Sequence, residues 1–292
     1  MQIITGKTEI EKYNHEGRDI YLKREDKNLS GSFKDRLVAY VWKDLQILPK
    51  EEITLSSSGN LAISLLYRQA KTSEPLRQRI TIFIRENLPS TKQEKLVDLA
   101  DQTGARILTS GKPKSDAKKY ARDNNAYHFR NSEGDHYPKA YYRLAEEIKN
   151  YSDEYGVEFG AVYVCASSGT AALGITRYFN EKSIKIPVVI TQTSYIHPIA
   201  KEFEKNAVSE KTTIANAISD RVVKRKGELV KELKKNQGGG AVCTNAEIEY
   251  ALEKLRYMLG KPAEGFTGNA GLSFAGYIKK PVINPLVVIS GN

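Results

Sequence analysis

Residues 81–129 read TIFIRENLPSTKQEKLVDLADQTGARILTSGKPKSDAKKYARDNNAYHF, and short β-branched runs alternate in them with longer amphipathic runs. The short runs predict buried strands at Thr81–Ile84, Arg106–Thr109 and Ala126–Phe129. The longer runs predict helices at Lys92–Thr103, which Gly104 closes, and at Ser115–Asn125, which a serine caps. Strands and helices in this βαβαβ order predict a parallel sheet with helices on its faces.

The same alternation continues on both sides of this segment. Before it, Ile53–Leu55 predicts a strand and Leu61–Gln69 a helix. After it, strands are predicted at Ala161–Ala166, Pro187–Ile190 and Leu286–Ile289, and helices at Tyr137–Tyr151, at Ala171–Asn180 and over much of Thr213–Lys280. Gln237–Gly240 is interpreted as a flexible loop between two helical segments. Two α/β layers are therefore expected, with a site in the crevice outside the carboxyl ends of the strands.

Composition sets the broad class of the protein. The chain has 292 residues, 40% of them hydrophobic and 27% charged, as in an ordinary soluble globular protein. The net charge of +10 is compatible with nucleic-acid binding or with an anionic small molecule. The densest basic cluster, residues 221–235, also contains Glu228 and Glu232, and no RNA-binding or zinc-finger signature accompanies it. Solvated helix faces are therefore favoured, and nucleic-acid binding is kept as an alternative.

Cysteine usage and apolar runs indicate the compartment. Cys165 and Cys243 lie far apart and form no CxxC pair, so neither a disulfide framework nor a zinc site is predicted, and no other metal site is expected. The first residues lack the apolar core of a signal peptide, and the longest apolar runs, such as Pro285–Ile289, are too short to span a bilayer. We expect a cytoplasmic protein with no membrane segment.

Residues 28–36, NLSGSFKDR, contain the first candidate for chemistry. Lys34 follows a Gly-Ser-Phe turn and directly precedes an apolar, helix-like run, so it is expected in the first turn of a helix. The positive end of a helix and apolar neighbours both disfavour a protonated amine. A lysine made partly neutral in this way can attack a carbonyl and form a Schiff base. The alternative is a solvated surface lysine, since lysine and arginine are abundant in this chain.

Two further stretches predict anion cradles. Ser56–Asn60 reads as strand, polar turn and helix, and the amides of such a turn suit a carboxylate, with Asn60 adding a donor. Ala166–Ala172 also follows a strand and opens a helix, and its small residues let the backbone approach a phosphate closely. It is neither a Walker loop nor a GxGxxG motif. For both stretches, a capped helix without a ligand is the alternative.

A fourth stretch, Val287–Asn292, places the hydroxyl of Ser290 at the end of a buried strand, where it reaches the mouth of the sheet. Alone it predicts little. A Schiff-base lysine, a carboxylate cradle, a phosphate cradle and a strand-end hydroxyl are together the parts of a pyridoxal-phosphate (PLP) site.

At these residues the chain resembles the fold-type-II PLP enzymes, the tryptophan-synthase-β-like family that includes threonine synthase, threonine and serine dehydratases and cysteine synthase. The resemblance covers nearly the whole chain in the right order. The matching segments are Leu22–Asp26 with Gly31–Arg36, Ser57–Asn60, Ser168–Thr170, Ala263–Gly265 with Ala270, and Ser290–Asn292. The loop Ser-Ser-Gly-Thr-Ala-Ala departs from the family, which is usually richer in glycine there, and so does the segment Phe266–Asn269.

The resemblance implies two three-layer α/β domains with mostly parallel sheets and an active site in the cleft between them. The larger domain would comprise residues 1–36 and 132–292, and the smaller one residues 37–131. A homodimer is likewise implied by the resemblance alone.

The resemblance also implies roles for individual residues. Lys34 would hold PLP as a Schiff base and later move the substrate α-proton, and Asn60 would hydrogen-bond the phenolic oxygen of PLP. The substrate carboxylate would be held by Ser57, Ser58 and Gly59. The phosphate would be held by Ser167, Ser168, Gly169, Thr170 and Ala171. Ser290 would face the pyridine nitrogen, where a neutral hydroxyl suits elimination and replacement better than transamination.

The motifs disagree about the reaction on the amino-acid substrate. Gly-Ser-Phe-Lys-Asp-Arg at 31–36 is most like threonine synthase, which favours elimination and replacement on O-phosphohomoserine as the first choice. Ser-Ser-Gly-Asn at 57–60 favours a threonine or serine dehydratase, and residues 177–182 resemble cysteine synthases. A PLP-binding homologue without turnover is a further alternative, because the phosphate loop is unusual.

Overall fold

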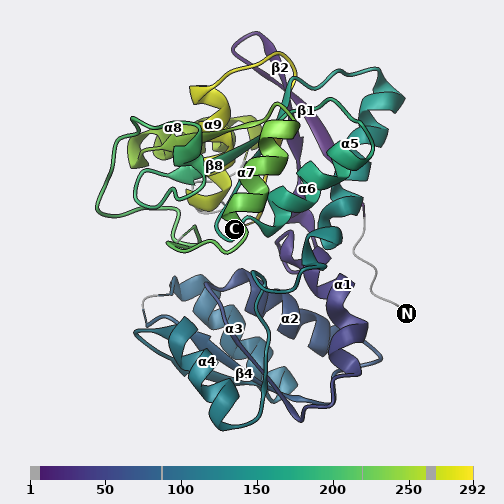
Figure 1. The fold of residues 1–292 in the computed structure, drawn as a ribbon, viewed down its shortest axis with the longest axis vertical. Coiled ribbons are helices and arrows are strands. Elements are labelled where there is room, and N and C mark those ends of the chain that lie inside the picture. Colours follow the sequence, from purple (N-terminus) through teal and green to yellow (C-terminus); the bar gives the residue numbers. More distant parts are fainter. Residues whose placement is uncertain (1–6, 87, 219, 261–267, 292) are drawn as a thin grey trace. The chain divides into compact units, whose positions relative to one another are not determined.

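The computed structural model describes residues 7–86, 88–218, 220–260 and 268–291. Its described residues form two compact units (Figure 1). The smaller unit contains residues 28–134, and the larger unit contains residues 7–27 together with the described residues from 135 onward.

The smaller unit is built on a four-stranded parallel sheet with the order β5-β4-β3-β6. Its strands are β3 (Glu52–Ser56), β4 (Arg79–Ile84), β5 (Arg106–Thr109) and β6 (Tyr127–His128). Its helices are α1 (Lys34–Gln46), α2 (Asn60–Lys71), α3 (Ser90–Thr103) and α4 (Pro113–Asp123). Helix α2 packs against α1 and α3, whereas α4 packs on β3 and β4. All four carboxyl ends of this sheet therefore meet at one edge, where the β3–α2 loop lies.

The larger unit is built on a six-stranded sheet with the order β1-β2-β10-β7-β8-β9. Its strands are β1 (Ile10–His15), β2 (Arg18–Lys23), β7 (Ala161–Cys165), β8 (Val188–Thr193), β9 (Gly239–Cys243) and β10 (Pro285–Val288). The pair β1–β2 is antiparallel and the other pairs are parallel. The carboxyl ends of β7 and β10 therefore lie next to each other, because these two strands are paired.

Helices cover both faces of the larger sheet (Figure 1). They are α5 (Tyr142–Tyr155), α6 (Thr170–Glu181), α7 (Lys226–Lys235), α8 (Asn245–Leu259) and α9 (Gly268–Lys279), with short 3₁₀ turns η1 (Glu25–Lys27), η2 (Tyr137–Tyr141) and η3 (Ala200–Glu202). Helix α9 packs on β7 to β10 and is covered by α8, whereas α6 contacts α5, α7 and β8. The core beneath α9 contains the fully buried Tyr163, Phe274 and Val287.

The predicted α/β class with mostly parallel sheets is confirmed, and most predicted elements lie within two or three residues of the observed ones. Gly104 ends α3 in the left-handed region, as predicted. The predicted helix at Ser115 begins earlier, at Pro113, because a proline fits the first helical position and no serine cap forms there. The predicted helix from Tyr137 starts as the 3₁₀ turn η2 before α5.

The prediction of a loop at Gln237–Gly240 is wrong, because Gly239 and Gly240 begin strand β9. Side chains at this point would block the sheet. A Cβ atom on Gly238 would lie 2.2 Å from the backbone oxygen of Val188, and one on Gly240 would lie 2.9 Å from the Cα atom of Ala200. The glycines that suggested flexibility therefore permit close packing of the edge strand.

The units differ from the predicted domains in where residues 28–36 belong. The sequence analysis placed residues 1–36 with the larger domain, whereas residues 28–36 lie in the smaller unit. Ser30 ties them there, since its hydroxyl lies 2.8 Å from that of Ser64 in α2 and its carbonyl accepts a hydrogen bond of 2.9 Å from Nζ of Lys95 in α3.

Candidate functional site

Lys34 is the first residue of α1, as its sequence position predicts. The turn before it is held by Asp35, whose carboxylate accepts hydrogen bonds from the backbone nitrogen and the hydroxyl of Ser30. The backbone nitrogen of Lys34 donates to Oγ of Ser32 at 3.3 Å, and Nζ of Lys34 lies 4.9 Å from the ring centroid of Phe33. Lys34 is thus a half-buried lysine on a well-braced helix end.

The predicted carboxylate loop follows β3 and leads into α2. Oγ of Ser57 accepts hydrogen bonds from the backbone nitrogens of Gly59, at 3.0 Å, and Ala62, at 3.2 Å. Gly59 has φ +115°, which a residue with a side chain rarely adopts. Ser58 is exposed in this loop, and Asn60 is the first residue of α2. The sequence alone identified this strand–turn–helix arrangement.

Ser32 connects Lys34 to this loop. Its Oγ accepts the backbone hydrogen bond of Lys34 and also one of 3.4 Å from Nδ2 of Asn60. Lys34 and Asn60, which are distant in sequence, are therefore neighbours at one edge of the smaller unit.

The sequence analysis missed Lys92, the third residue of α3. Lys92 is only 9% exposed, and its Nζ donates to Oδ1 of Asn60 at 2.8 Å. Burial lowers the pKa of Lys92 to about 8. The helical spacing contained a signal for this burial, because Lys92 precedes the buried Leu96 by four residues and Leu99 by seven.

The predicted phosphate loop lies in the larger unit between β7 and α6. Gly169 precedes α6 with φ +77°, and Thr170 and Ala171 form the buried first turn, which contains no acidic residue. The hydroxyls of Ser168 and Thr170 lie 3.2 Å apart. Such a turn directs backbone amides and the positive helix end at the same point.

A carboxylate that the sequence analysis did not anticipate contacts this loop. Oγ of Ser167 donates to Oδ2 of Asp220 at 2.9 Å. No sequence pattern indicated this pair, since the two residues are 53 positions apart.

Ser290 lies in the same unit as the phosphate loop, two residues after β10. It is 4% exposed, and its Oγ lies 3.1 Å from Sγ of Cys165, the last residue of β7. The backbone nitrogen of Cys165 in turn donates to Oγ of Ser273 in α9 at 2.9 Å. The larger unit thus brings Ser290 to the strand end from which the phosphate loop departs.

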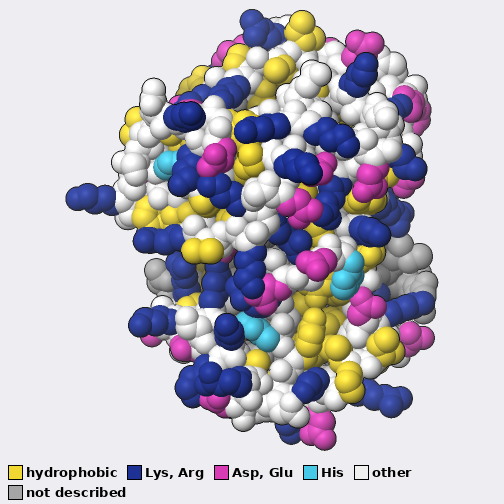
Figure 2. Space-filling model, viewed as in Figure 1, with side chains coloured by type: hydrophobic (Ala, Val, Ile, Leu, Met, Phe, Trp, Pro, Cys, Tyr) yellow, Lys and Arg dark blue, Asp and Glu magenta, His cyan; other side chains and the backbone are white. Residues whose placement is uncertain are grey.

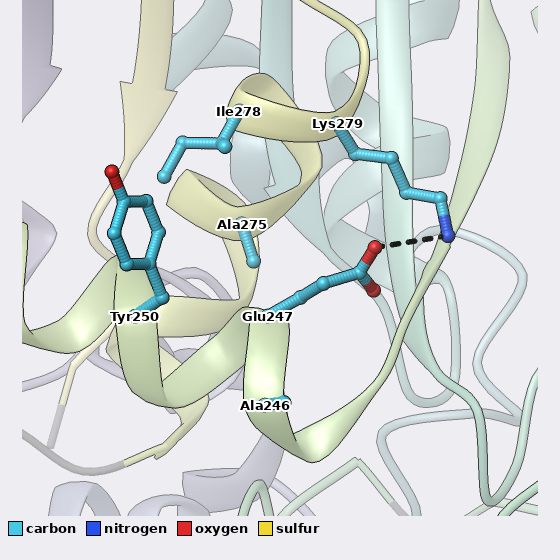
Figure 3. Close-up of a pocket in the computed structure, with 6 residues that line it drawn as sticks. All are labelled: Ala246, Glu247, Tyr250, Ala275, Ile278 and Lys279. Atoms are coloured by element: carbon cyan, nitrogen blue, oxygen red, sulfur yellow. Dashed lines mark ion pairs between the residues drawn. The ribbon is translucent and has the colours of Figure 1, made fainter.

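Parts of the predicted site lie outside the described residues, namely Ala263–Gly265, Phe266, Thr267 and Asn292. A separate pocket of about 280 Å³ lies between α8 and α9 (Figure 3). Its lining includes Tyr250, Ile278 and the ion pair of Lys279 with Glu247 (3.4 Å), and it contains none of the predicted site residues.

Three further observations bear on the class of site. On the face shown in Figure 2, Lys and Arg side chains are spread widely and Asp and Glu lie among them. No helix within the described ranges is both long and apolar enough to cross a membrane. The same ranges hold no group of three or more His, Cys, Asp or Glu side chains arranged to bind a metal ion.

Comparisons with known proteins agree with this arrangement. Residues 3–289 match the family model described as "Pyridoxal-phosphate dependent enzyme". A threonine deaminase from the organism abbreviated T.th. superposes with a TM-score of 0.79 at 16% identity, covering 98% of this chain and 93% of that chain. O-acetylserine-dependent cystathionine β-synthase from Helicobacter pylori gives 0.77 at 20% identity, covering 99% and 94%.

A third solved structure, a fungal L-serine ammonia-lyase from Rhizomucor miehei, gives 0.78 at 14% identity, covering 98% of this chain and 93% of that chain. At these identities the likeness shows the fold. A search of curated proteins found no match.

Proposed function

Since the chain belongs to the family of pyridoxal-phosphate dependent enzymes, we propose that it binds PLP at Lys34 and catalyses elimination or replacement at the β or γ carbon of an amino acid. The observation that supports this most is the shared contact at Ser32. Its Oγ accepts from the backbone of Lys34 and from Nδ2 of Asn60, so a reactive lysine and an amide donor lie together. A lysine beside such a donor suits a carbonyl cofactor with an adjacent oxygen.

The residues of the larger unit fit a phosphate-bearing cofactor. A Cβ atom on Gly169 would lie 2.8 Å from Cδ2 of Leu229, so only a glycine leaves the loop backbone open and unstrained at φ +77°. The hydroxyls of Ser168 and Thr170 and the amides of α6 would hold the phosphate. The buried hydroxyl of Ser290 would serve the ring nitrogen as a neutral partner.

When bound, PLP supplies an electron-withdrawing ring that stabilises negative charge at the substrate α carbon. Nζ of Lys34 would hold the cofactor and accept the proton from that carbon. Nδ2 of Asn60 would donate to the phenolic oxygen and fix the orientation of the ring. Ser57, Ser58 and Gly59 would bind the substrate carboxylate through the β3–α2 loop. A neutral hydroxyl at Ser290 would leave the ring nitrogen less protonated than a carboxylate would, which favours loss of a β or γ substituent.

A threonine-synthase-like reaction on O-phosphohomoserine remains our first choice of substrate, because residues 31–36 match that enzyme most closely. Dehydration of threonine or serine and replacement on an activated serine are the alternatives. A homologue that binds PLP without turnover is a second candidate function, and the Asp220 carboxylate at the phosphate loop favours it.

The test begins with the cofactor. Purified protein mixed with PLP is expected to turn yellow, and borohydride reduction followed by peptide mapping is expected to find the label on Lys34. Lys34→Ala should lose the colour, whereas Lys95→Ala, which removes an exposed lysine from α3, should keep it. A protein that stays colourless with added PLP would overturn the proposal.

The reaction is then separated by products. O-phospho-L-homoserine should release phosphate, L-threonine or L-serine a 2-oxo acid, and O-acetyl-L-serine with sulfide should release acetate. A spectral change with every substrate and no product with any would favour the homologue without turnover. We also expect a homodimer, which light scattering on the PLP-loaded protein would test.

A further inference from the structure

Lys92 is a buried cation whose charge is not matched by a carboxylate. Among the described residues, its ammonium makes one hydrogen bond, to Oδ1 of Asn60, and no ion pair. Its stem lies so close to the β3–α2 loop that a Cβ atom on Gly59 would stand 2.9 Å from Cδ of Lys92. A neutral amide oxygen therefore carries the whole task of compensating this charge.

The position is unfavourable for a cation in two further respects. Lys92 lies in the first turn of α3, and its ammonium contacts the first residue of α2, so the positive ends of two helices surround it. Burial also disfavours the charged form and lowers the pKa of Lys92 to about 8. An anion at this point would offset all three unfavourable contributions.

The first turn of α2 also offers free donors. The backbone nitrogens of Ser58, Asn60 and Leu61 make no hydrogen bond to any residue within the described ranges, whereas those of Gly59 and Ala62 donate to Ser57. Ser58 is exposed, so an anion from solvent can reach these amides. Three amides and one ammonium form a donor set that suits a carboxylate or a phosphate.

We propose that Lys92 and the first turn of α2 form an anion site that receives the carboxylate of the amino-acid substrate. This inference rests on the proposed function and adds a residue that determines specificity. Lys92 would supply a full positive charge to a loop whose other groups are neutral, and would thereby select substrates that carry the anion. A side-chain phosphate on the substrate would satisfy the same chemistry, and the experiment separates the two sources.

Binding is measured on the PLP-loaded protein by the change in its visible spectrum. L-alanine is compared with L-alaninamide, which lacks the carboxylate, and O-phospho-L-serine with L-serine. In Lys92→Gln, the preference for L-alanine over L-alaninamide should fall roughly tenfold, because a charge-assisted contact is lost. Lys95→Gln removes a charge from the same helix and should keep the preference. A fall confined to the phosphoserine pair would assign the site to the side-chain anion and overturn the carboxylate assignment.

A second readout does not need PLP. The protein as purified is treated with limiting acetic anhydride in acetate or in chloride at equal ionic strength, and acetylation of Lys92 relative to Lys95 is measured by peptide mass. Acetate should slow the modification of Lys92 severalfold, because an anion holds the amine in its charged form. An unchanged ratio, together with unchanged ligand preferences in Lys92→Gln, would overturn the inference. A protein that takes up no PLP would overturn the proposed function, and the acetylation ratio would still decide this inference.

Discussion

The hydroxyl of Ser290 lies 3.1 Å from the thiol of Cys165, which joins the end of β10 to the end of β7. The two strands are parallel neighbours, so their carboxyl ends meet at one edge of the sheet. The residue before the phosphate loop and the residue expected at the cofactor ring are therefore linked by a side-chain contact. Changing one of them should affect both stability and cofactor binding.

Cys165→Ala is the first variant that tests this link. We expect it to lower the free energy of unfolding by about 1 kcal/mol more than Cys243→Ala, because the contact to Ser290 is lost in addition to the thiol. Cys243 is the matched control, since it is fully buried in β9 and its pKa is raised to about 12 by burial. Urea unfolding measures the difference, and titration with PLP should show weaker binding in Cys165→Ala only. Equal effects of the two variants would contradict the link.

Much of the fold was predictable because its signals are local. Strand β5 at Arg106–Thr109 and helix α3 ending before Gly104 follow from β-branched runs, amphipathic spacing and a left-handed C-terminal residue. The edge strand β9 was not predictable in this way. Its two glycines resemble a loop in sequence, and only the close approach of Val188 and Ala200 explains them.

The candidate site was predictable to the same extent. Lys34, Asn60 and Gly169 stand at strand ends or helix starts, where a local pattern indicates their positions. Lys92 and Asp220 were missed because each acts through a tertiary contact, with Asn60 and with Ser167. Charge at such positions is decided by what packs around the residue, and a single sequence does not state this.

Gly169→Ala tests the phosphate loop through its backbone. Its φ of +77° and the 2.8 Å approach of a Cβ atom to Cδ2 of Leu229 both oppose a side chain. Gly156→Ala is the control, since Gly156 has φ +64° and nothing lies within 4 Å of its Cβ position. Gly156→Ala should cost about 1 kcal/mol of stability through strain alone. Gly169→Ala should cost more and should also weaken PLP binding, and identical losses without a change in PLP affinity would argue against the assigned loop.

Asp220→Asn tests the unexpected carboxylate. The Asp220 carboxylate accepts a hydrogen bond from Ser167 in the loop assigned to the phosphate dianion, so like charges would repel there. Asparagine keeps an acceptor for Ser167 and removes the charge. We expect PLP to bind roughly fivefold more tightly, which corresponds to about 1 kcal/mol for a partly screened pair. Equilibrium titration at low salt measures this, with the gain shrinking as salt is added.

Asp153→Asn is the control for Asp220, because Asp153 forms a surface ion pair with Lys149 on α5. It should leave PLP affinity unchanged. Weaker binding in Asp220→Asn would indicate that the carboxylate helps to hold the cofactor by orienting Ser167, and would remove the reason for considering a homologue without turnover.

His128 predicts how the smaller unit responds to acid. It lies in β6, its buried Nε2 has no hydrogen-bond partner among the described residues, and burial followed by the charge of Arg130 lowers its pKa to about 4. Because the unfolded chain binds a proton near the ordinary pKa of about 6.5 and the folded chain does not, stability falls as pH drops from 6.5 to 4. The loss should be about 1–3 kcal/mol, reduced from the full shift because the ring is partly exposed.

The measurement for His128 is the free energy of unfolding in urea at pH 7 and at pH 4.5. His128→Gln removes the titrating group, so its loss of stability between the two pH values should be smaller than that of the wild type by about the same 1–3 kcal/mol. His136→Gln, which changes an exposed histidine of the larger unit, should follow the wild type. Comparing variants at each pH cancels the contribution of the carboxylates that also titrate in this range. An equal loss in wild type and His128→Gln would show that the ring gains its proton in the folded state as readily as in the unfolded chain.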